Sequence, residues 1–317
     1  MQPSIVAVLV RVGPVVVLIA AGMVVRRGGL VSSSSMEELK KLVVNLALPA
    51  VLFRAFFDMD LDWSYLSIFA TILIVCVVLW FYGVWSGRTV WRGRPYHPFL
   101  TTGFEFGMLG IPLFAAAYGM QYVGYIAIVD LSHELFIWFV FVTLLLRRRD
   151  GAASLAQTAG SFIRSPVILG ILAGLLLNAL GARDAVRATA AGQVALETFS
   201  LLGGMLVPAI LLIIGYGLRF SGLVLREAIG GIALRLAALI PIAAFVVLVL
   251  VRRVFALPLP FERAVVTFLL LPPPYIIPLF MPESAHNERD YVHSVLSLYT
   301  ALTVVLFVVY VVLNPTI

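Results

Sequence analysis

The sequence predicts an all-α polytopic membrane protein whose ten transmembrane helices form two inverted five-helix repeats. Three observations lead to this fold class. The 317-residue chain is 62% hydrophobic and 12% charged, with a mean hydropathy of +1.07, which excludes a soluble globular domain. Apolar runs of about 20 residues, long enough to cross a bilayer, recur along the whole chain. Two of these runs are interrupted in the same way, one in each half.

The first repeat is predicted over residues 1–146. Its spans cover about 4–25, 38–57, 65–85, a broken segment ending at 118, and 123–146. The first span is not expected to be a cleaved signal peptide, because it lacks a preceding basic region and a small-residue cleavage site. A polar connection, residues 147–162, contains three consecutive arginines and separates the halves.

The second repeat is predicted over residues 163–317. Its spans cover about 163–180, 191–218, 232–251, a second broken segment and 291–313. An odd number of spans in each half inverts the second half relative to the first.

The distribution of positive charge predicts the orientation. Most basic residues fall in connections on one side, which is therefore cytoplasmic, whereas the connection 58–62 carries acids and no base. We expect a multi-pass protein of the inner (cytoplasmic) membrane with both termini outside. The net charge of +6 reflects these connections, so no nucleic-acid partner is expected.

The two broken segments predict the substrate site. Residues 101–114 read TTGFEFGMLGIPLF and residues 267–280 read TFLLLPPPYIIPLF. Proline and glycine interrupt a helix and leave backbone groups without helical partners, which membranes tolerate only against protein or a water-filled cavity. Interrupted segments at matching positions of two halves mark the substrate site of a transporter. The alternative is a pair of proline-kinked packing helices.

The candidate substrate-binding residues lie in both breaks and in the second span, where Asn45 comes one turn before a proline. They are Asn45, Glu105, Gly107, Met108, Gly110, Pro112, Pro274, Tyr275 and Pro278. A carboxylate inside a broken membrane helix is a site hypothesis by itself.

The fifth span supplies candidates for ion coupling. Asp130, His133 and Glu134 lie at positions i, i+3 and i+4, so we expect them on one helical face. Together with Glu105 they are predicted to relay a proton or cation. The alternative is a polar helix interface in which His133 bonds a neighbouring helix. A metal site is not expected, because no second histidine follows at a ligand spacing.

The chain resembles the auxin efflux carrier family, whose bacterial members include proposed malonate carriers. The family's fourth span reads Asn-x-Gly-Phe-x-Gly-x-Pro-Leu, then small residues and Tyr-Gly; here the matching positions are Glu105, Gly107, Met108, Gly110, Pro112, Leu113, Tyr118 and Gly119. The resemblance implies ten helices in two inverted repeats with the fourth and ninth crossing at their breaks. It also implies a fold related to bile-acid sodium symporters, an elevator-like cycle and a homodimer.

Two departures from the family pattern bear on the substrate. Glu105 and His133 stand where the family usually has asparagine. A carboxylate at the crossover repels an organic anion unless it is protonated or paired. It equally suggests a cationic or neutral substrate, or a proton taken up with the anion.

We therefore predict a secondary active transporter of a small organic anion, auxin-like or a dicarboxylate, that uses protons and no cofactor. Its partners would be the solute, protons or sodium, and the lipid bilayer. The alternatives are a sodium/proton antiporter, a sodium-coupled symporter and a membrane-embedded enzyme using His133 and Glu134. An enzyme is not expected, because the sequence lacks a nucleophile or paired metal motif, and no nucleotide-binding loop is present.

Overall fold

The computed structural model describes residues 5–60, 62, 65–150, 155–218, 224–282 and 285–317, which fold into helices joined by short connections. The helices of the first half are α1 (Ile5–Arg27), α2 (Ser33–Leu42), η1 (Val43–Ala47), α3 (Leu48–Asp58), α4 (Tyr65–Thr89), α5 (His97–Thr101), η2 (Phe106–Gly110), α6 (Ile111–Tyr118), η3 (Met120–Tyr122), α7 (Val123–Phe136), η4 (Ile137–Val142) and α8 (Thr143–Asp150).

The remaining helices begin in the connection between the predicted halves. They are α9 (Leu155–Ile163), α10 (Pro166–Ala179), α11 (Arg183–Ala188), α12 (Ala190–Gly217), α13 (Leu225–Phe245), η6 (Val246–Val254), α14 (Leu259–Leu270), η7 (Ile277–Phe280) and α15 (His286–Leu313). Residues 151–154 of that connection lie outside the described residues.

Six stretches of the described residues are long and apolar enough to span a membrane: 65–89, 97–118, 120–149, 190–217, 225–254 and 287–313. They coincide with the predicted third, fourth, fifth, seventh, eighth and tenth spans. The other four predicted spans correspond to α1, to α2–η1–α3, to α10 and to α14–η7. The all-helical membrane fold is therefore confirmed, whereas the count of ten spans stays a prediction.

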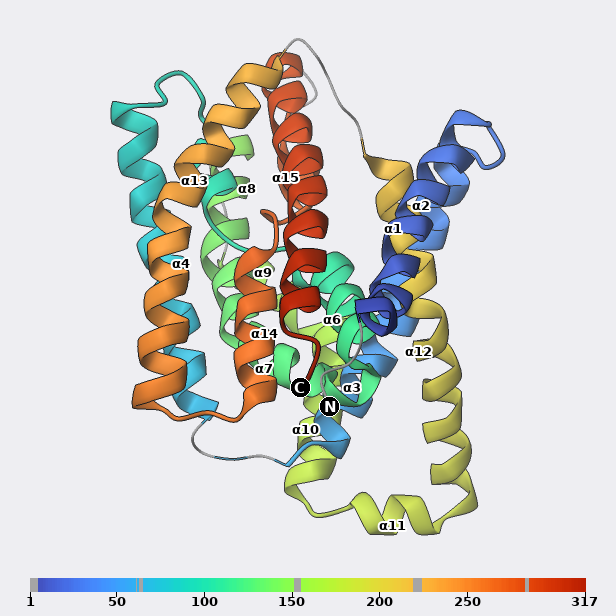
Figure 1. The fold of residues 1–317 in the computed structure, drawn as a ribbon. Coiled ribbons are helices and arrows are strands. Elements are labelled where there is room, and N and C mark those ends of the chain that lie inside the picture. The colour runs from blue at the N-terminus through green and yellow to red at the C-terminus, as the bar shows by residue number, and fades with distance from the viewer. Residues whose placement is uncertain (1–4, 61, 63–64, 151–154, 219–223, 283–284) are drawn as a thin grey trace.

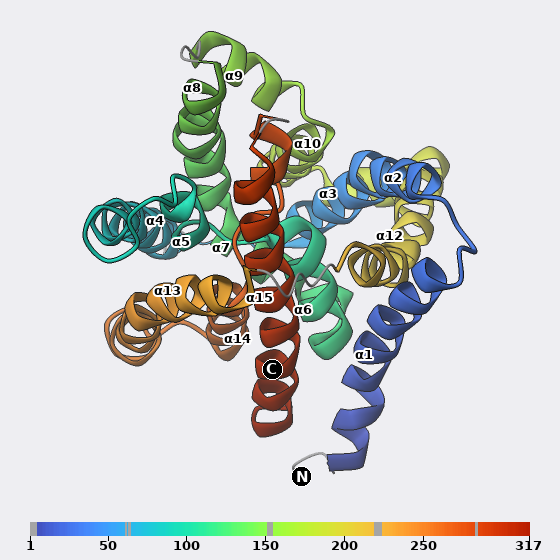
Figure 2. The ribbon, with the colours of Figure 1, turned by 90° about the horizontal axis from the view of Figure 1, so that it is seen from above.

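The helices divide into two groups that face each other. The α12 group consists of α1, α2–η1–α3, α10 and α12, and its strongest internal contacts join α3 to α10 and α1 to α12. The crossover group consists of α4 to α8 and α13 to α15. Figure 2 shows α12 and α1 on the opposite side of the molecule from α4 and α13, with α6 and α15 between them. The groups meet where α6 and η2 pack on α12, and where α15 packs on α1.

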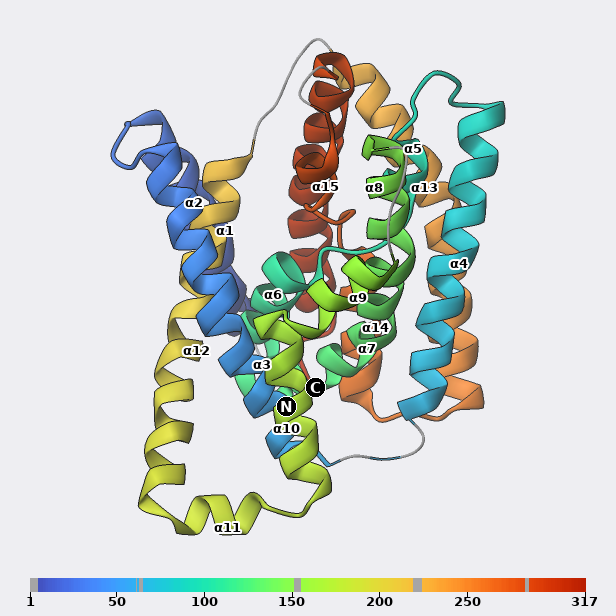
Figure 3. The same cartoon turned by 180° about the vertical axis from the view of Figure 1, so that it is seen from behind.

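Positive charge gathers at one end of the bundle. The helix ends that carry Arg26, Arg88 and Arg148 lie together at the top of Figure 1, and α11 lies at the opposite end. In the view from behind, α3 and α10 run side by side towards α11 (Figure 3). At the α11 end, Arg183 pairs with Asp60 at 2.9 Å and Arg187 with Asp58 at 2.8 Å.

Glycines allow close helix contacts within the α12 group. A Cβ added to Gly215 of α12 would lie 1.9 Å from the Ile19 carbonyl oxygen, and one added to Gly22 of α1 would lie 2.2 Å from that of Leu212. In the other pair, a Cβ on Gly170 of α10 would lie 2.6 Å from the Pro49 carbonyl oxygen. Small residues at such contacts let membrane helices pack by backbone approach.

Replacing Gly215 by valine is expected to separate α1 from α12 and to destabilise the protein by about 2 kcal/mol, since added side-chain volume has no room here. Thermal unfolding of the purified protein in detergent measures the effect. The matched control is Gly217→Val on the same helix, because a Cβ at Gly217 meets nothing within 4 Å. Equal midpoints for the two variants would contradict the close contact.

Candidate functional site at the helix crossover

The two predicted breaks meet in the interior of the crossover group. The helix α5 ends at Thr101 and η2 begins at Phe106, while α14 ends at Leu270 and η7 begins at Ile277. The Glu105 backbone N–H donates to the Pro272 carbonyl oxygen at 2.8 Å, so a direct hydrogen bond joins the two broken segments. The structure thus brings together segments that are far apart in the sequence.

Glycine is required where the breaks touch. Gly103 adopts φ +74°, a left-handed conformation that favours glycine, and an added Cβ would lie 2.8 Å from Cγ of Pro274. A Cβ on Gly110 would lie 2.8 Å from Cδ1 of Leu271. These approaches place the predicted site residues Gly110 and Pro274 on either side of the contact.

Glu105 caps both chain segments that leave the crossover. Its Oε1 accepts from the Met108 N–H at 3.2 Å, and its Oε2 accepts from the Tyr275 N–H at 2.6 Å. Glu105 is the N-cap residue of η2 and is only 9% exposed. A carboxylate at exposed N–H groups is the arrangement that helix N-termini offer to bound anions. The side chain therefore occupies a ready-made carboxylate site formed by two breaks.

Arg235 of α13 caps both helices that enter the crossover. Its Nη1 donates to the Leu100 carbonyl oxygen at 3.1 Å, and its Nη2 donates to those of Gly103 and Leu271 at 2.8 and 3.2 Å. The side chain is fully buried, with its guanidinium 5.1 Å from the ring centres of both Phe104 and Tyr299. No acid pairs with it among the described residues, so backbone carbonyls and aromatic rings stabilise the charge.

Each kind of helix end at the crossover is therefore paired with a side chain of opposite charge. Helix C-termini carry partial negative charge and helix N-termini partial positive charge. The chain itself puts the Arg235 cation on the carbonyls of the two entering helices and the Glu105 carboxylate on the amides of the two leaving segments. Any solute or ion that binds these backbone groups must displace one of the two side chains.

His133 links the fifth span to the first break. Its Nε2 accepts from the Phe104 N–H at 2.9 Å, and its Nδ1 lies 2.8 Å from Oδ1 of Asp130. Since Nε2 is the acceptor, the ring proton sits on Nδ1 and points to Asp130. Both side chains are buried. A second proton on the imidazole would break the bond to Phe104, so the protonation state of this pair is tied to the backbone of the break.

Glu134 belongs to a different contact. Its Oε2 accepts from the Trp138 indole N–H at 3.0 Å, one turn along the same helix, and its side chain is only partly buried. The prediction of one face shared by three groups is thus realised as a bonded pair, Asp130 and His133, with Glu134 beside it.

Replacing His133 by alanine leaves the Phe104 N–H and the Asp130 carboxyl without this partner in the interior. Since each unsatisfied buried group costs about 1–3 kcal/mol, we expect a loss of about 2–4 kcal/mol, measured as a lower thermal-unfolding midpoint in detergent. Glu134→Gln is the control, because the amide oxygen can still accept from Trp138. A destabilisation no larger than the control's would show that His133 does not hold the break.

The remaining predicted site residues take structural positions around the crossover. Pro112 is the second residue of α6 and Pro278 the second residue of η7, so both lie in first turns. Tyr275 bonds Thr300 through its hydroxyl at 2.7 Å. A Cβ on Gly107 would lie 3.4 Å from Leu48 of α3, which puts that break next to the α12 group. Asn45 is exposed on η1 and donates to the Lys41 carbonyl oxygen at 2.7 Å, so its amide serves its own helix.

A cavity of about 620 Å³ separates the two groups at the α11 end. Its walls come from α3 and α12 on one side and from η3 and α7 on the other, with Arg54, Asp58 and Tyr65 also lining it. Arg54 bonds Ser200 of α12 and lies 3.3 Å from Asp58. The crossover residues described above do not line this cavity. The cavity and the crossover are therefore separate features of the structure.

Arg235 is the functional residue that sequence reasoning missed. It lies inside the apolar eighth span without any neighbouring motif. An arginine at that depth is a signal on its own, because intramembrane charges are costly and are kept where they bind something. Its targets, three carbonyls from two distant segments, are visible only in the fold.

Comparison with known proteins identifies the family. The family model described as "Membrane transport protein" matches residues 7–258. No curated protein matches the chain. The matched range includes the first break, the His133 pair and Arg235, and a transporter family is consistent with the absence of a predicted catalytic motif. The chain is a multi-pass membrane protein of the auxin efflux carrier family of membrane transport proteins.

Proposed function

We propose that this chain is a secondary active transporter that moves a small organic anion, auxin-like or a dicarboxylate, together with a proton. The crossover carries the proposal: two broken segments meet, and one backbone amide of each, that of Met108 and that of Tyr275, donates to a single carboxylate, that of Glu105. Such amides suit the carboxylate of a substrate.

An architecture of two inverted five-helix repeats, residues 1–146 and 163–317 joined by 147–162, accounts for the helix contacts. Inversion relates span one to span six and span two to span seven. The contacts of α1 with α12 and of α10 with α3 are then equivalent, and both rely on glycines. Likewise α4 with α7 corresponds to α13 with α15.

The division into two groups supports an elevator cycle. The α12 group would form the fixed scaffold, and the crossover group would carry the site across the membrane. The cavity of about 620 Å³ between them supports this boundary, because it lies at the interface that must slide. With the arginine-rich end cytoplasmic, this cavity opens outside, and both termini lie outside the inner membrane.

Proton coupling follows from competition at the amides. An ionised Glu105 both occupies the Met108 and Tyr275 N–H groups and repels an incoming anion. A protonated Glu105 loses its charge and gives up the amides more readily. The substrate anion and one proton therefore enter together, so the pair has no net charge for a monocarboxylate and a charge of −1 for a dicarboxylate dianion.

Sodium coupling is the less favoured alternative. In broken-helix transporters, free carbonyls at the half-helix C-termini coordinate sodium. Here the Arg235 guanidinium already binds carbonyls from both entering helices. Because the guanidinium already supplies a positive charge to these carbonyls, a sodium ion is not needed there.

Uptake into proteoliposomes tests the substrate class. A panel of mono- and dicarboxylates and of cationic amines is offered with the outside acidified, in sodium or in choline buffer. We expect uptake of at least one carboxylate, at equal rates in the two buffers. Uptake of amines alone would replace the proposed substrate class, and a strict need for sodium would replace the proposed coupling ion.

A further inference from the structure

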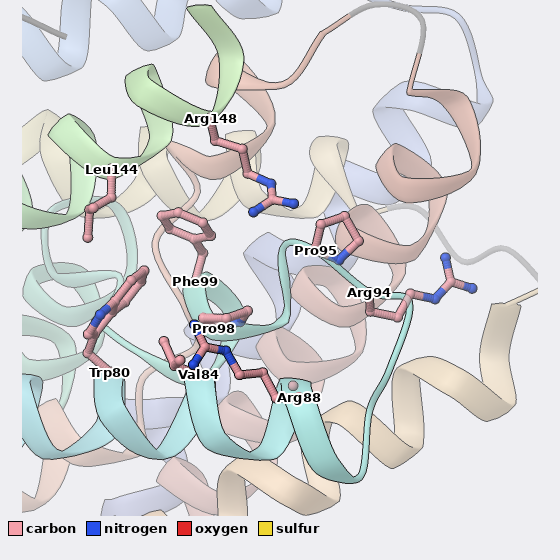
Figure 4. A pocket seen from close by; sticks show the side chains of 10 residues that line it. Trp80, Val84, Arg88, Arg94, Pro95, Pro98, Phe99, Leu144 and Arg148 are labelled. Carbon is pink, nitrogen blue, oxygen red and sulfur yellow. The ribbon is translucent and has the colours of Figure 1, made fainter. Parts of the chain in front are cut away.

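A second cavity, of about 310 Å³, lies at the arginine-rich end of the bundle, away from the crossover. Its walls come from α4, from α5 and the segment that leads into it, and from α8. Trp80 and Leu144 lie on one side of it, and Arg88 and Arg148 reach in from opposite walls, with Phe99 and Pro98 between them in the view of Figure 4. The cavity is thus amphipathic.

The positive charge of this cavity is not neutralised by the protein. Arg94 also lines it, but its guanidinium points away in Figure 4 and pairs with Glu227 and with Glu288, the latter at 2.7 Å. By contrast, no carboxylate pairs with Arg88 or Arg148 in the part of the chain that the structure describes, and no acid lines the cavity. Arg148 lies over the ring of Tyr96, 5.3 Å from its centre.

We propose that this cavity binds an anionic phospholipid, with the phosphate between Arg88 and Arg148 and the upper acyl chain against Trp80 and Leu144. The two arginines end the membrane helices α4 and α8, so they lie at headgroup depth. Basic pockets between helices at the cytoplasmic surface suit acidic headgroups. A small free anion would leave the apolar side unexplained, whereas a lipid contacts both the apolar side and the arginines.

The bound lipid would touch the helix that leads into the transport site. Pro98 and Phe99 of α5 line the cavity, and α5 ends at Thr101, directly before the first break. His97, the first residue of α5, bonds Ser86 of α4 at 3.0 Å and so ties α5 to α4. A lipid wedged here braces α4, α5 and α8 as one unit. This inference does not depend on the identity of the transported solute.

Titration of the purified full-length protein with short-chain phosphatidylglycerol in a neutral detergent tests the site, with the thermal-unfolding midpoint as readout. The double variant Arg88→Gln/Arg148→Gln is expected to bind about 25-fold more weakly, since each arginine contributes about fivefold. The matched control, Arg92→Gln/Arg147→Gln, removes the same charge from the connection just after α4 and from α8, at residues that do not line the cavity. We expect it to bind like the parent.

A second variant tests occupancy without changing charge. A Cβ on Gly87 would meet the His97 ring at 3.6 Å and Pro98 at 3.8 Å, which are ordinary contacts. Because Gly87 lines the cavity and its added Cβ has room, the Gly87→Leu side chain is expected to occupy the cavity and to abolish the lipid-induced rise in midpoint.

Four results would each overturn the proposal. An equal loss in the control pair would indicate diffuse attraction to the whole basic end. An equal rise with phosphatidylcholine would show that charge is not recognised. An equal rise with inorganic phosphate alone would identify an anion site rather than a lipid site. Unchanged lipid binding by Gly87→Leu would show that the cavity is not where the lipid lies.

Discussion

Replacing Arg235 by leucine is expected to lower the thermal-unfolding midpoint by about 10 °C, the largest loss of stability for any single side chain at the crossover. The substitution leaves the carbonyls of Leu100, Gly103 and Leu271 without this donor in a place that is fully buried. Each such group costs about 1–3 kcal/mol, so a total of at least about 3 kcal/mol follows, and each kcal/mol lowers the midpoint by about 2–4 °C.

Two companion variants separate the capping role from a general effect of charge on α13. Arg235→Lys keeps the cation but has no planar fork to serve three carbonyls, so we expect an intermediate midpoint. Arg226→Leu removes an exposed arginine from the first turn of the same helix and is expected to change the midpoint by less than about 2 °C. If Arg235→Leu behaves like Arg226→Leu, the guanidinium does not hold the crossover.

Replacing Glu105 by alanine is expected to tighten binding of the transported anion at least tenfold at neutral pH and to remove the pH dependence of binding. The alanine variant vacates the Met108 and Tyr275 amides and removes a negative charge from the site. Two like charges about 4 Å apart repel each other by about 1 kcal/mol in water and by about 4 kcal/mol near a protein surface. In the parent, affinity should instead rise as the pH falls, since protonation of Glu105 has the same effect.

Equilibrium binding of radiolabelled substrate to purified protein, repeated across a pH series, measures both effects. Glu134→Gln serves as control, because Glu134 is bonded to Trp138 rather than to the crossover. Loss of binding in Glu105→Ala with Glu134→Gln intact would mean that Glu105 attracts a cationic solute, and the proposed competition would be wrong.

The breaks could be located from the sequence because proline and glycine act locally. Pro112 and Gly110 interrupt the fourth span wherever it packs, and the matched spacing of Pro278 in the second half predicts that the two breaks meet. The structure confirms the meeting through the bond from Glu105 to Pro272. The shape of the second break was less predictable, since Pro272–Pro274 leaves only the four-residue η7 where the first break continues into α6.

The partners of buried charges could not be predicted, because they depend on which helices pack together. Spacing put Asp130, His133 and Glu134 on one face, but i+3 and i+4 diverge enough that His133 meets Phe104 while Glu134 meets Trp138. Arg235 binds carbonyls, which carry no sequence signature. The polar character of the site was thus visible in the sequence, whereas the hydrogen-bond partners of its charged groups could be identified only from the fold.

Accumulation of substrate against its gradient tests the central claim, that Glu105 couples a proton to an organic anion at the crossover. Proteoliposomes holding the parent or Glu105→Gln receive a radiolabelled carboxylate identified from the panel, with and without an acidic outside. We predict that the parent concentrates the solute only when the pH gradient is present, whereas Glu105→Gln merely equilibrates it. Accumulation by Glu105→Gln equal to that of the parent would contradict the account.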